Sequence, residues 1–478
     1  MLNLIDYLAL ACIPPLAILF LVLAVDDFII DSVAWLMGLK PQAVHPRELV
    51  AMRLIPEKRF AVMIAAWKES DVIQQMVRGN LQAVDYDQYV FFIGIYPNDR
   101  ETATEVQILA HKFPGRLHII ENALPGPTCK GQMLNEVVRG IFKHERQTGL
   151  PFDALLIHDA EDVMHPQSLR LLNRELNSAD FVQIPVFSQS VKGQSLIAGT
   201  YMDEFAESHT KDLLVREHLG ASVPSAGVGT AISRELVLAA TTNKNGRLFN
   251  ESSLTEDYEL GMSAGELGFR GHFACYHLGD ESNPDFIATR EHFPRTLWQS
   301  IRQKTRWTVG IAFQGTENIG WKGTLIQRLF LYRDRKGPIS NLAGGAGILL
   351  LAYTAVRSAS GVPGPLLHNP FGLQGLPIFF EALLFINLLL MSNRLLQRAI
   401  CSTRVYGLAS APWSLLRVPV SNLVNAISAL RATALYLTHL LTGKPLSWAK
   451  THHELPKDFG RVPDTSEENC ASTEAKAG

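Results

Sequence analysis

The stretch Leu155-Leu156-Ile157-His158-Asp159-Ala160-Glu161-Asp162 decides the fold of this chain, because an apolar run stops there at three carboxylates. Residues 154–157 are apolar, which is typical of a buried strand in a parallel sheet. In open α/β sheets, ligands bind at the carboxyl ends of the strands. Carboxylates gathered there repel one another unless a cation joins them, and Mg²⁺ or Mn²⁺ held by carboxylate and phosphate oxygens is the usual solution. The alternative is a solvated acidic turn after a strand.

Apolar runs alternate with amphipathic segments upstream of this stretch. The expected strands are residues 60–66, 89–95, 117–120 and 154–157. The expected helices are residues 71–80, 102–112 and 130–144. This order predicts an α/β fold with a mostly parallel sheet and helices on both faces. No Gly-x-Gly-x-x-Gly follows the first strand and no P-loop is present, which disfavours a dinucleotide-binding Rossmann site and a P-loop site.

Polar side chains follow three of these strands. Glu69 follows the first strand, Asp99 the second and the acidic cluster the fourth. Each alone is compatible with an ordinary polar loop, but the carboxyl ends of parallel strands meet at one edge and form a crevice. Further on, the small residues 225–230 form a loop that we expect to enter a helix at Ser233. Such a loop suits phosphates or sugar hydroxyls, and a simple tight turn is equally compatible with it.

A second acidic cluster occurs at Thr255-Glu256-Asp257. A carboxylate held near a reacting centre can act as a general base if its pKa suits the task. The alternative is a helix start with Thr255 as the N-cap, since acidic residues favour the first helical turn. The two interpretations are compatible.

Residues 8–25 are uncharged and long enough to span a membrane. No basic segment precedes them, so we do not expect a cleavable signal peptide. Basic residues follow them, and the positive-inside rule then places the next domain in the cytoplasm. Residues 337–356 and 376–391 read as further spans. Residues 418–441 carry polar groups and read as an interfacial or re-entrant helix.

Residues 294–336 carry nine basic side chains with apolar residues between them: Arg295, Arg302, Lys304, Arg306, Lys322, Arg328, Arg333, Arg335 and Lys336. This pattern predicts basic amphipathic helices on the inner membrane leaflet. The alternative is a basic face packed on the soluble domain. The whole chain has a net charge of −2, which excludes a general nucleic-acid footprint, and its five scattered cysteines indicate neither a disulfide framework nor a structural zinc site.

The expected organisation has five parts. These are a membrane helix at 1–35, a cytoplasmic α/β domain at 36–293, interfacial helices at 294–336, a membrane region at 337–441 and a cytoplasmic tail at 442–478.

Taken together and in order, these motifs resemble the membrane-bound family-2 glycosyltransferases, the group of the cellulose and hyaluronan synthases. The matching pieces are Glu69, Asp99, Lys130 to Asn135, Asp159-Ala160-Glu161-Asp162, Gln183-Ile184-Pro185, Thr255-Glu256-Asp257 and Gln303-Lys304-Thr305-Arg306-Trp307. The resemblance implies a GT-A fold, a nucleotide-sugar donor and inversion at the anomeric carbon.

The resemblance also implies roles for single residues. Glu69 and Asp99 correspond to the residues that hold uridine, and Lys130 lies near the nucleotide. Asp159 and Glu161 match the metal-binding D-x-D pair, with Asp162 as an alternative ligand because Glu161 replaces the usual aspartate.

The remaining roles concern sugar transfer. Asp257 matches the base of the T-E-D motif, in which Glu256 is its neighbour, and Gln183 lies near the sugar pocket. Gln303, Arg306 and Trp307 match Q-x-x-R-W, with Arg306 near the diphosphate and Trp307 under the acceptor sugar.

The expected function is therefore a metal-dependent, inverting transferase of the bacterial inner membrane that elongates a cell-surface polysaccharide from a UDP-sugar with Mg²⁺ or Mn²⁺. Its expected partners are the donor, a growing glycan or lipid acceptor, membrane lipid and an outer-membrane export protein, without nucleic acid. The alternatives are a transferase that adds single sugars to a polyprenyl phosphate, and a non-catalytic subunit of an envelope complex.

Overall fold

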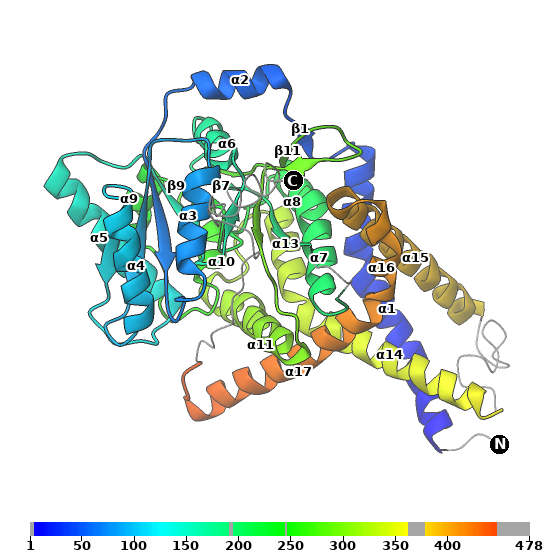
Figure 1. The fold of residues 1–478 in the computed structure, drawn as a ribbon. Coiled ribbons are helices and arrows are strands. Elements are labelled where there is room, and N and C mark those ends of the chain that lie inside the picture. The colour runs from blue at the N-terminus through cyan, green and yellow to red at the C-terminus, as the bar shows by residue number, and fades with distance from the viewer. Residues whose placement is uncertain (1–3, 191–194, 244–245, 362–377, 447–478) are drawn as a thin grey trace, which may run out of the picture.

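The computed structural model describes residues 4–190, 195–243, 246–361 and 378–446, and a seven-stranded sheet forms its centre (Figure 1). The strands follow the order β10-β7-β9-β5-β2-β3-β4. Their bounds are β2 Phe60–Ala65, β3 Tyr89–Ile95, β4 Leu117–Glu121, β5 Ala154–His158, β7 Phe181–Gln183, β9 Thr230–Ser233 and β10 Gly271–Phe273. Only β9 runs antiparallel to its neighbours, β5 and β7. The predicted mostly parallel α/β fold is confirmed.

Helices cover both faces of this sheet, and the alternation of side chains along β2 shows why. Phe60, Val62 and Ile64 pack into the core on one face, while Ala61 and Met63 pack into the core on the other. The first face is covered by α3 Ile73–Ala83, α4 Arg100–Lys112 and α6 Ser168–Glu175. The second face is covered by α5 Lys130–Thr148, α9 Arg234–Asn243 and α10 Glu256–Glu266. Both faces of β2 are buried, so its run of apolar residues is continuous.

Two small sheets lie beside the central one. The first has the order β6-β13-β8, with bounds β6 Val163–Met164, β13 Thr289–Glu291 and β8 Val186–Ser188. The second joins β1 Gln42–Ala43 to β11 Tyr276–Leu278 and β12 Asp285–Phe286. A short helix, α2 Pro46–Leu54, links β1 to the central sheet. The first small sheet matters for the site, because β13 pairs with the strand that directly follows the acidic turn.

The loop 225–230 precedes the helix that was expected to begin at Ser233, but it does not lead into that helix directly. It leads into β9, and α9 begins at Arg234. Residues 230–233 are buried between β5 and β7, where their backbone groups find hydrogen-bonding partners in both strands. The expected helix start is thus met within one residue, and what was not expected is the short strand β9 before it.

Three helices of the described residues are long and apolar enough to cross a membrane. They are α1 Leu4–Leu36, α14 Gly337–Ala359 and α15 Ile378–Tyr406, and they lie together on the side away from the sheet (Figure 1). The expected spans fall within them, apart from residues 376–377, which lie outside the described residues. The helix α1 continues through Pro14 and Pro15.

The remaining helices connect the membrane helices to the sheet. They are α7 Ala198–Glu207, a π-helical turn Ser208–Asp212, α8 Leu213–His218, α11 Leu297–Thr308, a second π-helical turn Val309–Gln314, α12 Gly315–Asn318, α13 Leu325–Arg335, α16 Ala411–Leu416 and α17 Val418–Thr442. The helix α17 packs along both α11 and α14 (Figure 1). It is one continuous helix and is not among the three candidate spans. Its expected interfacial position stays a prediction.

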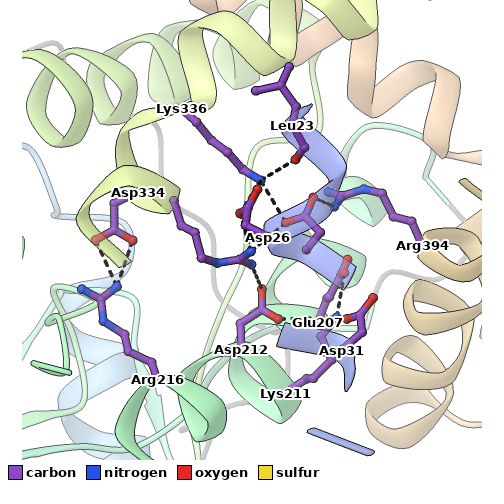
Figure 2. Close-up of polar contacts among 12 residues, drawn as sticks. Leu23, Asp26, Asp31, Glu207, Lys211, Asp212, Arg216, Asp334, Lys336 and Arg394 are labelled. Atoms are coloured by element: carbon purple, nitrogen blue, oxygen red, sulfur yellow. Dashed lines mark hydrogen bonds and ion pairs between the residues drawn. The ribbon is translucent and has the colours of Figure 1, made fainter. Parts of the chain in front are cut away.

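Several charges of the basic stretch 294–336 are bound inside the protein. The side chains of Arg333 and Lys336 pair with Asp26 and Asp27 of α1 at 2.6–3.1 Å (Figure 2). The ammonium of Lys304 pairs with Glu204 of α7 at 2.6 Å. Neither interpretation of the sequence describes these three residues. The charges of Arg333 and Lys336 are buried against α1, one of the candidate membrane helices, and that of Lys304 is buried against α7.

The helix α10 lies directly on the chain before the loop 225–230, and Gly261 makes this approach possible. A Cβ atom there would overlap the backbone nitrogen of Ser225. We expect Gly261→Ala to lower the free energy of unfolding by about 1–3 kcal/mol, as overpacking in cores does. The matched control is Gly265→Ala on the same helix, where the new methyl group meets the movable side chain of Ser222.

Urea titration in detergent measures both variants. A loss of stability for Gly261→Ala no larger than that for Gly265→Ala would contradict the close packing of α10 on this segment.

Candidate active site

The carboxyl ends of β2 and β5 open into a cavity of about 400 Å³. Its walls come from the segment after β2, the acidic turn after β5, the start of α10 and one face of α11. Nine of the twelve residues singled out in the sequence line it: Glu69, Lys130, Asp159, Glu161, Glu256, Asp257, Gln303, Arg306 and Trp307. Segments more than 200 residues apart along the chain therefore meet in one place.

Three carboxylates form the acidic wall of this cavity. Asp159, Glu161 and Glu291 each offer an oxygen, and these oxygens lie within 4.8 Å of one another. Burial and then the neighbouring carboxylates raise the pKa of Glu161 and of Glu291 well above the ordinary value. Three converging carboxylate oxygens are the ligands that hard divalent cations prefer. These residues therefore fit a divalent cation.

Glu291 was missed in the sequence, and the topology explains why. It ends β13, which pairs antiparallel with β6, the strand just after the acidic turn. This pairing brings a carboxylate from about 130 residues downstream next to Asp159 and Glu161. No local motif surrounds Glu291, so only the long-range pairing could have identified it.

Lys130 supplies positive charge between the two acidic clusters. Its ammonium pairs with Asp159 Oδ1 at 2.5 Å and donates to the carbonyl of Gly227 at 3.4 Å. Burial by itself lowers the pKa of Lys130, but the carboxylates of Asp159, Glu256 and Asp257 raise it well above the ordinary value. Lys130 is therefore held in its charged form.

Glu256 and Asp257 form the first turn of α10. Thr255 precedes them, but its side chain makes no capping hydrogen bond, so the expected N-cap box is absent. Burial raises the pKa of Asp257, and burial together with the Asp257 carboxylate raises the pKa of Glu256 to about 7. A carboxylate with a raised pKa is suited to accept a proton near neutral pH.

Gly227 fixes the position of Asp257 from the other side. Its φ is 83°, a conformation that favours glycine. A Cβ atom there would overlap the Oδ2 atom of Asp257. The loop thus needs glycine at this position both for its backbone conformation and for the space that the carboxylate occupies.

Gln183 does not line the cavity, although it was expected to lie near the sugar. Its side chain is fully buried and holds the loop 225–230. The Oε1 atom accepts from the backbone N–H of Ala226 at 2.9 Å and from the hydroxyl of Thr230 at 2.6 Å. The Nε2 atom donates to the carbonyl of Val228 at 2.8 Å. In this structure Gln183 shapes the loop.

Asp99 and Asp162 also lie outside the cavity lining. Asp99 caps α4 and accepts a hydrogen bond from the backbone N–H of Lys68 at 2.5 Å, which fixes the turn before Glu69. Asp162 is buried, and its Oδ2 atom accepts from His158 Nδ1 at 2.7 Å and from the backbone N–H of Asp159 at 2.9 Å. Both side chains thereby orient a neighbouring cavity residue.

Aromatic rings form the wall around Trp307. The rings of Phe205 and Phe293 line the cavity with it, at centroid distances of 6.2 and 6.4 Å from the indole. Tyr201 packs edge-on behind the same indole at 5.9 Å. Phe205 and Phe293 are single aromatic residues outside any motif, so they could not be identified from the sequence. The arrangement offers an apolar surface beside Asp257.

Comparison with known proteins bears on what this cavity does. A protein family described as "Glycosyltransferase like family 2" matches residues 56–310. The chain is 36% identical over 465 residues to "Bacteriophage adsorption protein B" of Escherichia coli K12 and, to the same extent, to "Bacteriophage N4 adsorption protein B" of Escherichia coli O157:H7. These alignments cover 93% of this chain, which spans 62% of the length of each relative.

Two solved structures resemble the fold more distantly. One is a mannosyltransferase from Pyrobaculum calidifontis in complex with GDP-Man and Mn²⁺, with a TM-score of 0.47, 14% identity and coverage of 78% of this chain and 98% of that one. The other is TarS of S. aureus in complex with UDP-GlcNAc, with a TM-score of 0.35, 10% identity and coverage of 79% and 92%.

The three carboxylates of the acidic wall lead to a prediction about the affinity for Mn²⁺. We expect Glu291→Gln to weaken Mn²⁺ binding at least about ten-fold, because it removes one of three converging carboxylates. Electron paramagnetic resonance of free Mn²⁺ measures the affinity. The control is Glu281→Gln, which removes an exposed carboxylate paired with Lys40 and should leave the affinity unchanged. Equal affinities of the wild type and Glu291→Gln would exclude Glu291 as a ligand.

Proposed function

The chain belongs to the family 2 glycosyltransferases, and from this premise we propose that it transfers a hexose from a UDP-sugar to a growing cell-surface polysaccharide, with inversion at the anomeric carbon. One observation carries the proposal: a single cavity joins three convergent carboxylates, a carboxylate suited as a base and an arginine beside an aromatic wall. Diphosphate recognition, proton removal and sugar binding require these three elements.

The donor half of the proposed site lies at the edge of the sheet. Asp159, Glu161 and Glu291 would hold Mg²⁺ or Mn²⁺, and Asp162 is a further candidate ligand from the sequence. When bound, such an ion neutralises the charge that develops on a diphosphate leaving group. Glu69 would bind the nucleoside, and Asp99 would support it through the backbone of Lys68.

Transfer would proceed as one displacement. The acceptor hydroxyl oxygen attacks the anomeric carbon of the donor and forms the new glycosidic bond as the bond to the diphosphate breaks. The bonding electron pair leaves with the diphosphate, and Asp257 takes the proton of the acceptor hydroxyl. Lys130 and Arg306 would stabilise the negative charge that develops on the leaving group. Attack from the face opposite the leaving group produces the inversion.

The acceptor half of the proposed site lies on α11. Trp307, with Phe205 and Phe293, offers an apolar wall for the face of an acceptor sugar, and Gln303 adds a polar group beside it. The cavity is bounded by α11, which packs on α17 beside the membrane helices. This arrangement supports a site close to the membrane, with membrane lipid around α1, α14 and α15. We further propose that synthesis takes place at the cytoplasmic face of the bacterial inner membrane, with an outer-membrane protein as the export partner.

The release of UDP by the purified protein in detergent tests this function. A panel of UDP-sugars and GDP-sugars should be assayed with Mn²⁺, Mg²⁺ or EDTA. We expect metal-dependent release from one UDP-sugar, and a polymer on a gel with that donor. A single sugar on a polyprenyl phosphate would support the lipid-linked alternative. Binding of UDP without release from any donor would favour a non-catalytic envelope subunit.

The proposed base gives a sharp prediction. We expect Asp257→Asn to lower the rate of transfer by at least about 100-fold, within the range for general bases, while UDP binding stays within about two-fold. The base acts only in the transition state, so the binding of the product nucleotide should not depend on it. Calorimetric titration with UDP measures binding. An equal loss of UDP affinity would assign Asp257 to donor binding instead.

The raised pKa of Asp257 predicts the pH dependence of turnover. A base acts only when ionised, so activity is present above its pKa and is lost as the pH falls through it. We expect kcat to fall on the acid side at a pH above 3.8, the ordinary value for aspartate. Lys130→Gln should move this limb to higher pH, because Lys130 is the cation that most lowers the pKa of Asp257.

UDP binding measured at the same pH values separates this effect from loss of the donor. An acid limb close to the ordinary aspartate value, unchanged in Lys130→Gln, would contradict the assignment of the base.

A further inference from the structure

Four consecutive charged residues, Arg333-Asp334-Arg335-Lys336, end α13 and reach three different parts of the protein. Arg333 and Lys336 bind α1, and Arg335 donates to the carbonyls of Gly315 and Gly320 at 2.8 and 2.6 Å. Asp334 points the other way, toward Arg216 (Figure 2). This segment therefore binds both the membrane helix α1 and the α/β domain.

The contact with α1 is extensive. Lys336 Nζ donates to both carboxylate oxygens of Asp26 at 2.7–2.8 Å, to Asp27 at 3.1 Å and to the carbonyl of Leu23 at 2.9 Å. The guanidinium of Arg333 binds the same two aspartates at 2.6 and 2.9 Å. Buried charges that have lost water are strongly held by their partners, because a lost partner leaves an uncompensated charge. The acidic turn of α1 thus fixes the end of α13.

On its other side, the end of α13 contacts Tyr258, the residue that follows the proposed base Asp257. The hydroxyl of Tyr258 donates to Asp334 Oδ2 at 2.7 Å. The guanidinium of Arg216 donates to both oxygens of Asp334 at 2.9 and 3.0 Å, and its Nε donates to the carbonyl of Ser222 at 2.6 Å. Asp334 therefore joins the first turn of α10 to the segment that leads into the loop 225–230. Arg216, Tyr258 and Asp334 line the same cavity as Asp257.

We propose that Asp334 is a positioning residue for Asp257, and that Asp26 and Asp27 of α1 act on the base through it. The inference rests on the proposed function of Asp257. Tyr258 anchors the turn that carries the base, and Asp334 is in turn fixed through α13 to α1. A displacement of about 1 Å in a catalytic group can cost roughly 100-fold in rate. The membrane helix then sets the geometry of catalysis besides anchoring the chain.

Two small substitutions test the catalytic end of this connection. Tyr258→Phe removes only the hydroxyl that binds Asp334, and Asp334→Asn removes the charge at nearly constant volume. We expect each to lower kcat by about 10- to 100-fold. We expect the donor KM and the UDP affinity of Tyr258→Phe to stay within about two-fold of the wild type. Its unfolding temperature should stay within a few degrees of the wild-type value. The kcat of the double variant should be close to that of the less active single variant, since both substitutions remove the same hydrogen bond between Tyr258 and Asp334.

A matched pair of α1 variants tests the membrane end. Asp26→Asn combined with Asp27→Asn removes the α1 carboxylates that bind Arg333 and Lys336. It leaves Asp212 beside Arg333 at 3.6 Å and also removes the partner of Arg394. The control is Asp6→Asn, which removes the carboxylate partner of Arg357 near the other end of the same helix, where no described contact leads to α13. We expect the double α1 variant to lower kcat by about ten-fold or more at unchanged donor KM, and the control to retain wild-type kcat.

The outcomes separate the inference from the proposed function. If the wild type releases no UDP from any donor, the proposed function fails. If the wild type is active but Tyr258→Phe keeps full kcat, the positioning role of Asp334 is wrong. If the Asp26→Asn, Asp27→Asn double variant and the Asp6→Asn control lose kcat equally, or if neither loses any, Asp26 and Asp27 have no specific effect on the base. If every variant that loses kcat also has a lower unfolding midpoint than the wild type, the contacts of Asp334 stabilise the fold and have no specific effect on the base.

Discussion

Repulsion among buried carboxylates is the constraint on which the site of this protein depends. Asp159, Glu161 and Glu291 meet at the acidic wall, and Glu256 and Asp257 begin the helix opposite. Concentrating negative charge away from water is unfavourable unless cations lie within a few ångströms. The protein places Lys130 between the two groups and Arg306 in the same cavity. The remaining deficit of positive charge raises the pKa of Glu161, Glu291 and Glu256, and it suits the cavity to a divalent cation.

The sequence predicts the sheet well because its signal is local. Runs such as residues 154–157 are apolar throughout, which a strand buried on both faces requires, and the turns that follow them carry the polar groups. The meeting of Glu69 with Asp159 and Glu161 follows from the same rule, since the carboxyl ends of parallel strands meet at one edge. The cavity residues on α10 and α11 follow no strand, and their place in the site was expected only from the family resemblance. Glu291 could not be predicted in this way, because its position depends on the pairing of two short strands that are far apart in the chain.

Roles that depend on burial could not be predicted either. Gln183 and Asp99 belong to the expected motifs, but their side chains hold backbone segments rather than line the cavity. A run of charges is equally ambiguous, because lipid headgroups and buried aspartates would select the same basic residues. The buried partners of Arg333 and Lys336 lie on α1, about 300 residues away in the sequence, and only the tertiary structure reveals the choice.

The cavity is assembled from two halves with different supports. The donor half rests on β2, β5 and β13, whose positions are fixed by the sheets and their cores. The other half comes from α10 and α11, and these helices are held by buried polar contacts to the membrane-side helices: Tyr258 to Asp334 on α13, and Lys304 to Glu204 and Asn425 on α7 and α17. The acidic wall is therefore supported by the α/β domain itself, whereas the positions of Asp257, Arg306 and the aromatic wall also depend on contacts between α10, α11 and the helices beside the membrane.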